Sequence, residues 1–199
     1  KYFMPHLIGS FCNKHPAIDV SLEILNRDGV VQRLRENLDD LYIMSMPPKD
    51  MDLGDEALMP NTIVVIAPNA DPLAKRSQIG LHELAQRRFI VREKGSGTRM
   101  AADQFFRKMK FRPDIRLELG SNEAVKESVA GGLGLGVVSR HALHGLKKEN
   151  GVSVIDIEGF PVSSAGHIVH PASKKLSPLA LAFKKHMIQE VGRRKRPLV

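Results

Sequence analysis

Short apolar segments with strand-like and helix-like spacing alternate along almost the whole chain, and this alternation limits the fold more than any other feature. Residues 17–25, "AIDVSLEIL", carry apolar side chains at every second position, which predicts a strand with one buried face. Residues 29–38 return to helical spacing, and the apolar "LYIM" at 41–44 predicts a buried strand. A strand, a helix and a strand with short connections form a βαβ unit, which implies a parallel sheet.

The same alternation continues to the last helix. Further strands are expected at 61–68, 87–93, 114–120, 133–139, 152–157 and 166–170. Helices are expected at 5–15, 80–86, 98–110, 121–132, 140–146 and 177–191. Ser121 and Ser177 stand where side chains cap a helix, and Pro178 fits a first helical position. The pattern as a whole predicts an α/β fold.

The expected elements fall into three blocks, 1–66, 67–166 and 167–199. The first and last blocks are each too small to fold well alone. We therefore expect them to form one discontinuous domain, with the middle block inserted as a second. The chain would then cross between the domains twice, near 63–69 and 165–170.

The composition is typical of a soluble globular protein with an excess of positive charge. Hydrophobic residues make up 42% and charged residues 26%, and the formal net charge of +8 favours anionic partners. No apolar run approaches the ~20 residues that span a bilayer, and the first residues show no signal-peptide pattern. Cys12 is the only cysteine, which excludes an internal disulfide. These features predict a cytoplasmic protein without membrane contact.

A glycine-rich turn, Gly95-Ser96-Gly97-Thr98, lies between an expected strand and an expected helix that Arg99 opens. It lacks the spacing and the lysine of a nucleotide-binding P-loop. Two interpretations remain open. The glycines and hydroxyls can simply turn the chain and cap the helix. Alternatively, the unpaired amides at the helix start can bind an anion, with Ser96, Thr98 and Arg99 as further donors.

A second expected strand ends in the same way, because Gly120, Ser121 and Asn122 connect it to the next helix. Taken alone, Ser121 is an ordinary cap. Ligands of open α/β sheets bind beyond the carboxyl ends of the strands, and both turns lie there, so the pair favours a ligand site. The glycines of "AGGLGLGVVS" (130–139) follow a helix and precede a strand, the reverse of a dinucleotide-binding motif, and indicate close packing.

No set of residues has the spacing of a metal site or a catalytic centre. The histidines at 6, 15, 82, 141, 144, 167 and 170 have no carboxylate partners at ligand spacing. Nucleophile and zinc-protease signatures are missing, and the acidic "KDMDLGDE" (49–56) is typical of a solvated loop. We therefore expect no catalytic residue, no metal and no cofactor.

An ordered set of segments resembles the effector-binding domain of LysR-type transcriptional regulators. The segments are "KYFMPHLIGSFCNKHP", "FIVREKGSGTR", "LELGSNEAVKESVAGGLGLGVVS", "GFPV" and "KKLSPLALAF", and together they run over nearly the whole chain. Within the family, "KYFMPHLIGSF" and "REKGSGTR" are similar to the regulators of carbon-dioxide fixation genes.

The resemblance implies a type 2 periplasmic-binding-protein-like fold: two Rossmann-like α/β subdomains joined by two crossover strands. Subdomain I would be 1–66 plus 167–199 and subdomain II 67–166, with a small anionic effector in the cleft between them. The implied contacts are Ser96, Gly97, Thr98, Arg99, Ser121 and Asn122 on one wall, and Asn26, Arg27, Ser45 and Met46 on the other. Effectors of this branch resemble phosphorylated or dicarboxylate metabolites.

Family members carry an N-terminal winged helix-turn-helix and a linker helix that are not part of this chain, so DNA contact is expected only through them. The family's first strand would also precede Lys1. Pairing into a homodimer or homotetramer is implied through the helices around Leu7–Lys14 and Glu123–Ala130, although the apolar stripe of the first helix can instead face its own sheet. Two other classes stay open from the residues alone: a solute-binding protein of a transporter, and an enzyme on the same fold.

Overall fold

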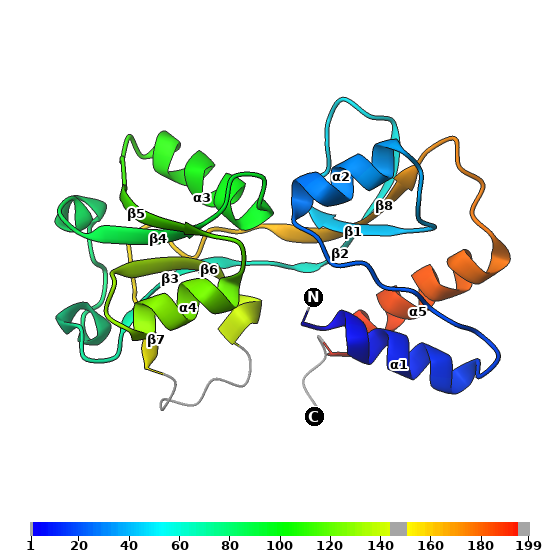
Figure 1. The fold of residues 1–199 in the computed structure, drawn as a ribbon, viewed down its shortest axis with the longest axis horizontal. Coiled ribbons are helices and arrows are strands. Elements are labelled where there is room, and N and C mark those ends of the chain that lie inside the picture. Colours follow the sequence, from blue (N-terminus) through cyan, green and yellow to red (C-terminus); the bar gives the residue numbers. More distant parts are fainter. Residues whose placement is uncertain (1, 144–150, 195–199) are drawn as a thin grey trace. The chain divides into compact units, whose positions relative to one another are not determined.

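The structure is a computed structural model that describes residues 2–143 and 151–194. The chain divides into two compact units, which Figure 1 draws with the chain coloured along its length. Unit 1 is Lys1–Pro60 together with Ala165–Val199, and unit 2 is Asn61–Ser164.

The chain passes between the units at two points that are close in space. Asn61 is the first residue after the first crossing, and Ser164 is the last residue before the second. The Asn61 amide donates to the Ser164 carbonyl at 2.8 Å. The boundaries expected from the sequence, 66/67 and 166/167, instead lie inside the strands β3 (Ile63–Pro68) and β8 (Ala165–Pro171). Apolar patterning indicates where a strand lies, but it does not show at which residue the chain passes from one unit to the other.

Unit 1 is built on a three-stranded sheet with helices on both faces. Its elements are α1 (Met4–Lys14), α2 (Arg27–Arg35), β1 (Tyr42–Ser45), β2 (Leu53–Pro60), β8 and α5 (Pro178–Arg194). The strand order is β1-β8-β2, and both pairs are antiparallel. Val169 of β8 pairs with Tyr42 on one side and with Asp55 on the other. A strand from the end of the chain therefore joins two early strands, which makes unit 1 discontinuous in sequence.

α1 and α5 share a core with one face of this sheet, and α2 covers the other. The first core contains Met4, Leu7, Leu58, Ile168, Met187 and Val191, and the second contains Leu34, Tyr42, Met44 and Val169. Each fully buried apolar side chain of this size contributes about 1.5–3 kcal/mol relative to leaving it exposed. The apolar stripe of α1 thus faces its own unit, which was one of the two interpretations of that helix.

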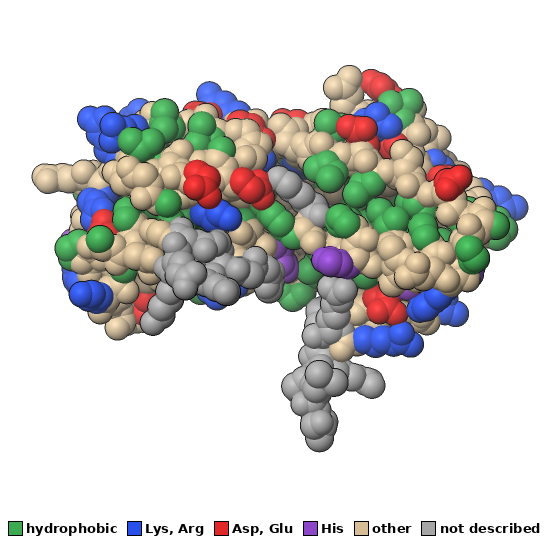
Figure 2. Space-filling model, turned by 60° about the horizontal axis from the view of Figure 1, so that its bottom comes forward, with side chains coloured by type: hydrophobic (Ala, Val, Ile, Leu, Met, Phe, Trp, Pro, Cys, Tyr) green, Lys and Arg blue, Asp and Glu red, His purple; other side chains and the backbone are tan. Residues whose placement is uncertain are grey.

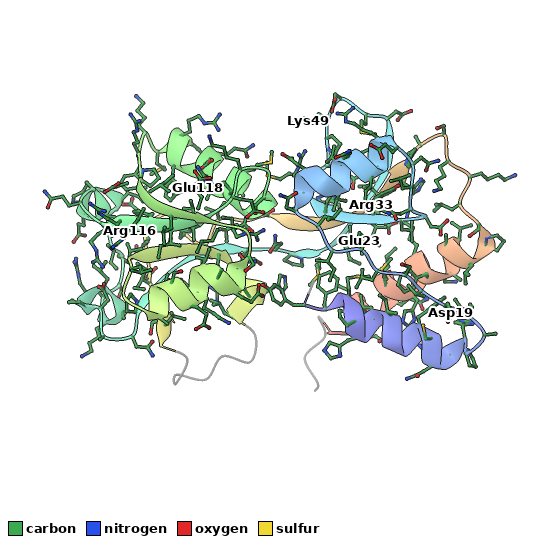
Figure 3. The ribbon with its side chains drawn as sticks, viewed as in Figure 1. Asp19, Glu23, Arg33, Lys49, Arg116 and Glu118 are labelled. Atoms are coloured by element: carbon green, nitrogen blue, oxygen red, sulfur yellow. The ribbon has the colours of Figure 1, made fainter. Side chains whose placement is uncertain are left out.

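A polar cluster ties α2 to the strand that follows it. Arg33 donates to both carboxylate oxygens of Asp39, at 2.8 and 2.7 Å, and these hydrogen bonds hold the pKa of Asp39 below its usual value. The Tyr42 hydroxyl donates to the Arg33 carbonyl at 3.0 Å and accepts from the Asp39 amide at 2.8 Å, and burial raises its pKa. Asp39 chiefly, and Glu23 to a smaller extent, raise the pKa of Arg33 (Figure 3).

The strand expected at 17–25 is wrong, because the structure has neither helix nor strand between α1 and α2. Leu22, Ile24 and Leu25 are exposed by 39%, 51% and 45%. Figure 2 shows hydrophobic side chains gathered on the surface of this unit. A strand needs a neighbour for its backbone hydrogen bonds, and within the described part of unit 1 no strand pairs with this segment. The parallel βαβ arrangement expected here is wrong for the same reason.

β2 corrects a second expectation, because the acidic stretch 49–56 is not all loop. Its last residues begin β2, although Asp55 and Glu56 have low strand propensity. Pairing with β8 along the strand overrides that propensity. The acidic side chains also have partners, since Asp55 Oδ1 lies 2.7 Å from His167 Nδ1 and Glu56 Oε2 lies 3.2 Å from Lys184 Nζ.

Unit 2 is built on a five-stranded sheet in the order β5-β4-β6-β3-β7. Besides β3, its elements are η1 (Pro72–Lys75), η2 (Leu81–Leu84), β4 (Arg88–Arg92), α3 (Gly97–Lys108), β5 (Asp114–Leu119), α4 (Asn122–Ala130), β6 (Leu135–Ser139), η3 (Arg140–Leu143) and β7 (Val152–Val154). β4 runs parallel to β5 and β6, whereas β3 is antiparallel to β6 and β7. The expected helices at 80–86 and 140–146 are short 3-10 turns as far as the structure describes them, and residues 144–150 lie outside that part.

α3 and α4 cover opposite faces of this sheet (Figure 1). Successive residues of β4 face them in turn: the Phe89 ring lies 5.9 Å from that of Phe106 in α3, and Ile90 packs against Val129 of α4. Gly136 of β6 lies under α4, where a Cβ would come within 2.6 Å of a Val129 methyl group. The close packing predicted for the glycines of 130–139 is confirmed at this position. Among the described helices, none combines the length and the apolarity that crossing a membrane requires.

Candidate functional site

The turns before α3 and α4 leave the sheet of unit 2 side by side. β4 and β5 are parallel neighbours, and their last residues, Arg92 and Leu119, are paired. The Glu93 amide then donates to the Leu119 carbonyl at 3.1 Å, which extends the pairing beyond β4. Because parallel strands end at the same edge of a sheet, the N-termini of α3 and α4 both lie at this edge.

The turn into α3 explains the first of its glycines. The Ser96 amide donates to the Glu93 carbonyl at 3.2 Å, which closes a four-residue turn. Gly95 has a φ of +88°, a conformation that residues with a Cβ adopt at a cost. The turn therefore requires glycine at 95, and α3 begins directly after Ser96.

Ser96 occupies the N-cap of α3, but its side chain does not cap the helix. The N-caps of the other polar helix starts behave differently. Asn26 accepts from the Gly29 amide at 3.0 Å, Ser121 from the Ala124 amide at 3.1 Å, and Ser177 from the Ala180 amide at 3.1 Å. Helix geometry leaves the first amides of α3 without an intrahelical acceptor, and Ser96 does not supply one.

The polar side chains at this edge are nonetheless buried. Ser96 exposes 3% of its surface, and Thr98, Arg99 and Asn122 expose 7% each. Buried polar groups in proteins are normally hydrogen-bonded, because leaving one without a partner costs about 1–3 kcal/mol. Buried hydrogen-bond donors clustered at a helix N-terminus form the anion-binding sites of many proteins.

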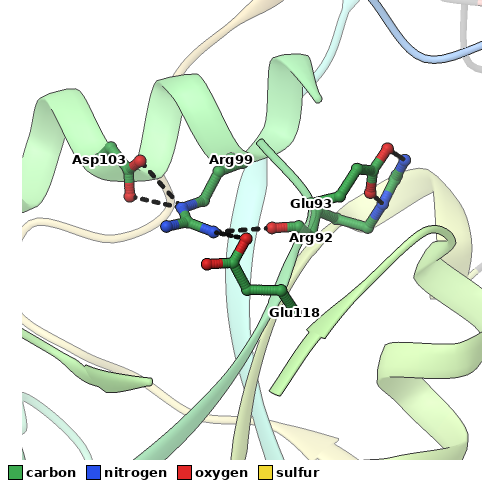
Figure 4. A network of polar contacts seen from close by, with 5 residues as sticks. All are labelled: Arg92, Glu93, Arg99, Asp103 and Glu118. Atoms are coloured by element: carbon green, nitrogen blue, oxygen red, sulfur yellow. Dashed lines mark hydrogen bonds and ion pairs between the residues drawn. The ribbon is translucent and has the colours of Figure 1, made fainter. Parts of the chain in front are cut away.

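Arg99 lies within this group, but its guanidinium is bound to other residues of unit 2 (Figure 4). Nε lies 2.9 Å from each carboxylate oxygen of Asp103, one turn further along α3. Nη1 donates to the Arg92 carbonyl at 2.9 Å and lies 3.2 Å from a carboxylate oxygen of Glu118 on β5. The side-chain contact between Arg99 and an effector stays a prediction.

The four residues expected on the other wall come together within unit 1. Asn26 is the N-cap of α2 and Arg27 is its first residue, while Ser45 ends β1 and Met46 follows it. Arg27 Nε donates to the Met46 carbonyl at 2.8 Å, so the two segments are directly joined. Met46 has a φ of +54°, which is uncommon for a residue other than glycine. Their role in binding also stays a prediction.

The described histidine, cysteine, aspartate and glutamate side chains do not gather into a metal site. Across residues 2–143 and 151–194, no group of three or more could hold a metal ion. Among the described residues, His167 pairs with a single carboxylate, that of Asp55. His186, which sequence reasoning had passed over, is 7% exposed and lies 2.8 Å from the Ser10 hydroxyl.

Sequence reasoning also missed the residues that hold Arg99. Asp103 follows Arg99 by four positions on a helix, and this spacing was a usable signal for an ion pair. Glu118 lies on a separate strand, and no local pattern connects it with Arg99. Only the parallel pairing of β4 with β5 brings it there.

Comparison with known proteins gives a consistent assignment. The family described as "LysR substrate binding domain" matches residues 1–192. The HTH-type transcriptional activator CmpR of Synechocystis sp. is 42% identical over 184 residues, which cover 92% of this chain and 60% of the relative. The RuBisCO operon transcriptional regulator of Acidithiobacillus ferrooxidans is 41% identical over 187 residues, covering 94% and 60%. The chain thus spans about 60% of the length of these curated relatives.

A solved structure agrees with this assignment. The Synechocystis CcmR regulatory domain in complex with 2-PG matches with a TM-score of 0.92 and 39% identity, over 96% of this chain and 91% of that one. The type 2 periplasmic-binding-protein-like fold and the resemblance to regulators of carbon-dioxide fixation are both confirmed. The chain therefore belongs to the LysR substrate-binding domain family, on the branch that includes the RuBisCO operon regulators.

Proposed function

We propose that this chain is the effector-sensing domain of a longer, cytoplasmic transcription regulator, and that it binds a small phosphorylated or dicarboxylate anion at the N-terminus of α3. Two comparisons support the proposal. The similar proteins are named as transcriptional regulators, and the solved relative holds 2-PG, which is 2-phosphoglycolate. In this proposal, the part of the protein outside these residues contacts DNA.

The observation that carries the proposal is the uncapped start of α3. Ser96 is buried at the N-cap and does not cap, whereas Ser121 and Ser177 do. An anion there would accept hydrogen bonds from the first-turn amides of Gly97, Thr98 and Arg99, and the helix dipole would favour its charge. The hydroxyls of Ser96 and Thr98 would add two further donors.

The neighbouring start of α4 fits a second acidic group of the same ligand. Ser121 uses its hydroxyl oxygen to accept from Ala124, so its proton can still be donated. Asn122 lies at the first position of α4 and is buried. A ligand with a phosphate at one end and a carboxylate at the other could therefore engage both turns. In unit 1, Asn26, Arg27, Ser45 and Met46 are further proposed contacts.

The experiment is calorimetric titration of 2-phosphoglycolate into the protein and into two serine variants. Ser96→Ala should weaken binding by about 10- to 100-fold, since a hydrogen bond to a charged group contributes about 1.5–3 kcal/mol. It should leave the melting temperature of the free protein nearly unchanged, because this hydroxyl caps nothing. Ser177→Ala is the matched control: it should cost about 1 kcal/mol of stability and leave binding unchanged.

Two results would contradict the proposal. Unchanged affinity in both Ser96→Ala and Thr98→Ala would show that the anion does not bind at α3. Chemical conversion of 2-phosphoglycolate by the protein would assign the domain to enzymes rather than to sensors. Assays of released phosphate and proton NMR spectra of the ligand would detect it.

A further inference from the structure

We propose that the Arg99 side chain is a positioning residue of this anion site, which fixes the turn before α3 without contacting the anion. This inference rests on the function proposed above, because it concerns the same site. It also reverses the intuitive role of an arginine beside an anion, since unit 2 would hold the anion by neutral donors.

The first reason is the direction of the side chain. Figure 4 shows the guanidinium beside Asp103, which lies one turn nearer the carboxyl end of α3 than Arg99. The amides that would bind the anion lie in the opposite direction along the helix axis, in the first turn of α3. With 8% of the side chain exposed, the guanidinium is enclosed in this place.

The second reason is that the Nε and Nη1 donors of Arg99 are already in use. Nε carries one N–H group, which the two oxygens of Asp103 share at 2.9 Å each. Nη1 carries two, and it contacts the Arg92 carbonyl at 2.9 Å and Glu118 at 3.2 Å. Turning toward an anion would break these contacts and would leave two carboxylates without their cation.

The third reason is the charge of the cluster. Two carboxylates, Asp103 and Glu118, face the single guanidinium of Arg99. The adjacent Arg92 is neutralised by Glu93, with contacts of 2.8 and 2.9 Å. These five residues carry two positive and three negative formal charges, so they give an anion no net attraction. The contribution of unit 2 to binding must then come from the amides, the hydroxyls and the helix dipole.

What Arg99 does instead is to connect the three elements that define the site. It lies on α3, binds the last residue of β4 through the Arg92 carbonyl and binds β5 through Glu118. The turn that contains Ser96 starts immediately after Arg92. Holding Arg92, α3 and β5 together therefore determines where Ser96 and the first-turn amides point.

A double-mutant cycle tests this role, with the dissociation constant of 2-phosphoglycolate as the readout. Arg99→Met should weaken binding on the order of tenfold, the lower end of what loss of a supporting contact costs at metal sites. If Arg99 acts through the turn, adding Ser96→Ala should then weaken binding by no more than about a further twofold. If Arg99 contacts the anion, the two effects multiply, and the inference is overturned.

Two more variants distinguish the two roles. Arg99→Lys keeps the charge but not the planar fork, so it should lose as much affinity as Arg99→Met, whereas a contact to the anion would be largely retained. Asp103→Asn removes a negative charge near the site. It should weaken binding if Arg99 positions the turn and strengthen binding if Arg99 attracts the anion. Arg116→Gln, on the same strand as Glu118 but outside the cluster, is the charge control (Figure 3).

The melting temperature of each variant, measured without ligand, identifies those that are merely unfolded. Failure of the proposed function would be visible separately, as a Ser96→Ala variant that binds like the unmodified protein. A different result would reject only the positioning role: Ser96→Ala alone weakens binding, and its effect multiplies with that of Arg99→Met. The proposed site would then stand.

Discussion

Three serines occupy the same position at the start of three helices, and the structure gives them two different roles. Ser121 and Ser177 accept a hydrogen bond from the amide three residues on, and Ser96 does not. The sequence around each serine allows a cap, so residue type and spacing could not separate them. The chain also enters α3 through a turn in which Gly95 has a φ of +88°. The sequence therefore shows which serines could cap a helix, and the structure shows which of them do.

His186 is the residue for which we predict a pH effect on stability. It is buried between α1 and α5, beside the Ser10 hydroxyl at 2.8 Å and the Phe11 ring at 5.3 Å. Burial chiefly, with Lys14 and His15 adding repulsion and Glu190 opposing them, lowers its pKa below 6.5. The unfolded chain then binds the proton more readily than the folded one. Stability should be full above pH 6.5 and should fall as the pH drops from there toward the lowered pKa.

The measurement is urea unfolding at several values between pH 7.5 and pH 5. In the His186→Gln variant, which keeps a hydrogen-bonding side chain without a titrating ring, the loss of stability over this range should shrink. The same substitution at the exposed His82 is the control, and it should leave the loss unchanged. An equally steep loss in His186→Gln would show that other groups cause it.

At the scale of elements, the strand predicted at 17–25 failed because strand formation depends on a neighbour, whereas apolar alternation is a property of the segment itself. We predict that Leu22→Ser costs less than about 0.5 kcal/mol in this chain, as for a surface position. Leu7→Ala, in the core between α1 and the sheet, should cost about 2–5 kcal/mol. Chemical denaturation of both variants makes the comparison.

The stability cost of Leu22→Ser can also be measured in a chain extended at its N-terminus. The family resemblance places a first strand before Lys1, and residues 17–25 have the alternation that a partner strand needs. If that strand pairs with this segment, the cost of Leu22→Ser should rise to about 1–3 kcal/mol in the extended chain. An unchanged cost would mean that the segment is exposed in the longer protein as well.

Helices with strong local signals were predicted closely, and elements that depend on distant partners were not. The helix expected at 98–110 is Gly97–Lys108, and the one expected at 177–191 is Pro178–Arg194, because each has apolar periodicity and a polar residue before its start. β2 was missed because its acidic residues resemble a loop and only β8, more than a hundred positions later, makes it a strand. For the candidate site, sequence indicated the two turns, but it could not reveal that Arg99 is enclosed by Glu118.

At the scale of the whole molecule, the property to test is the pairing of two chains. We propose that two chains pair through α1 and α4, as the family resemblance implies. The apolar residues of α1 are used inside unit 1, so the contact would use the opposite face of this helix, which carries His6, Gly9 and Asn13. A Cβ at Gly9 would meet no other atom within 4 Å, so a larger residue fits there without disturbing the unit.

Gly9→Arg should therefore separate pairing from folding. If the proposal is right, analytical ultracentrifugation should show a dimer for the unmodified protein and a monomer for Gly9→Arg, because a long charged side chain would stand in the contact. The stability of unit 1 should stay the same or rise by roughly 0.5–1 kcal/mol, since glycine is unfavourable inside a helix. A dimer that persists in Gly9→Arg would place the contact on another surface.

The uncapped start of α3 has a consequence for how such a domain can change over generations. A carboxylate at position 96, as in Ser96→Asp, would cap α3 from within and would repel any anion that approached. In the proposed function, anion binding at this place thus depends on Ser96 leaving the first amides of α3 uncapped. A substitution at this one position would supply the missing cap, and the domain would then keep its fold, gain stability and lose the proposed response to an anion.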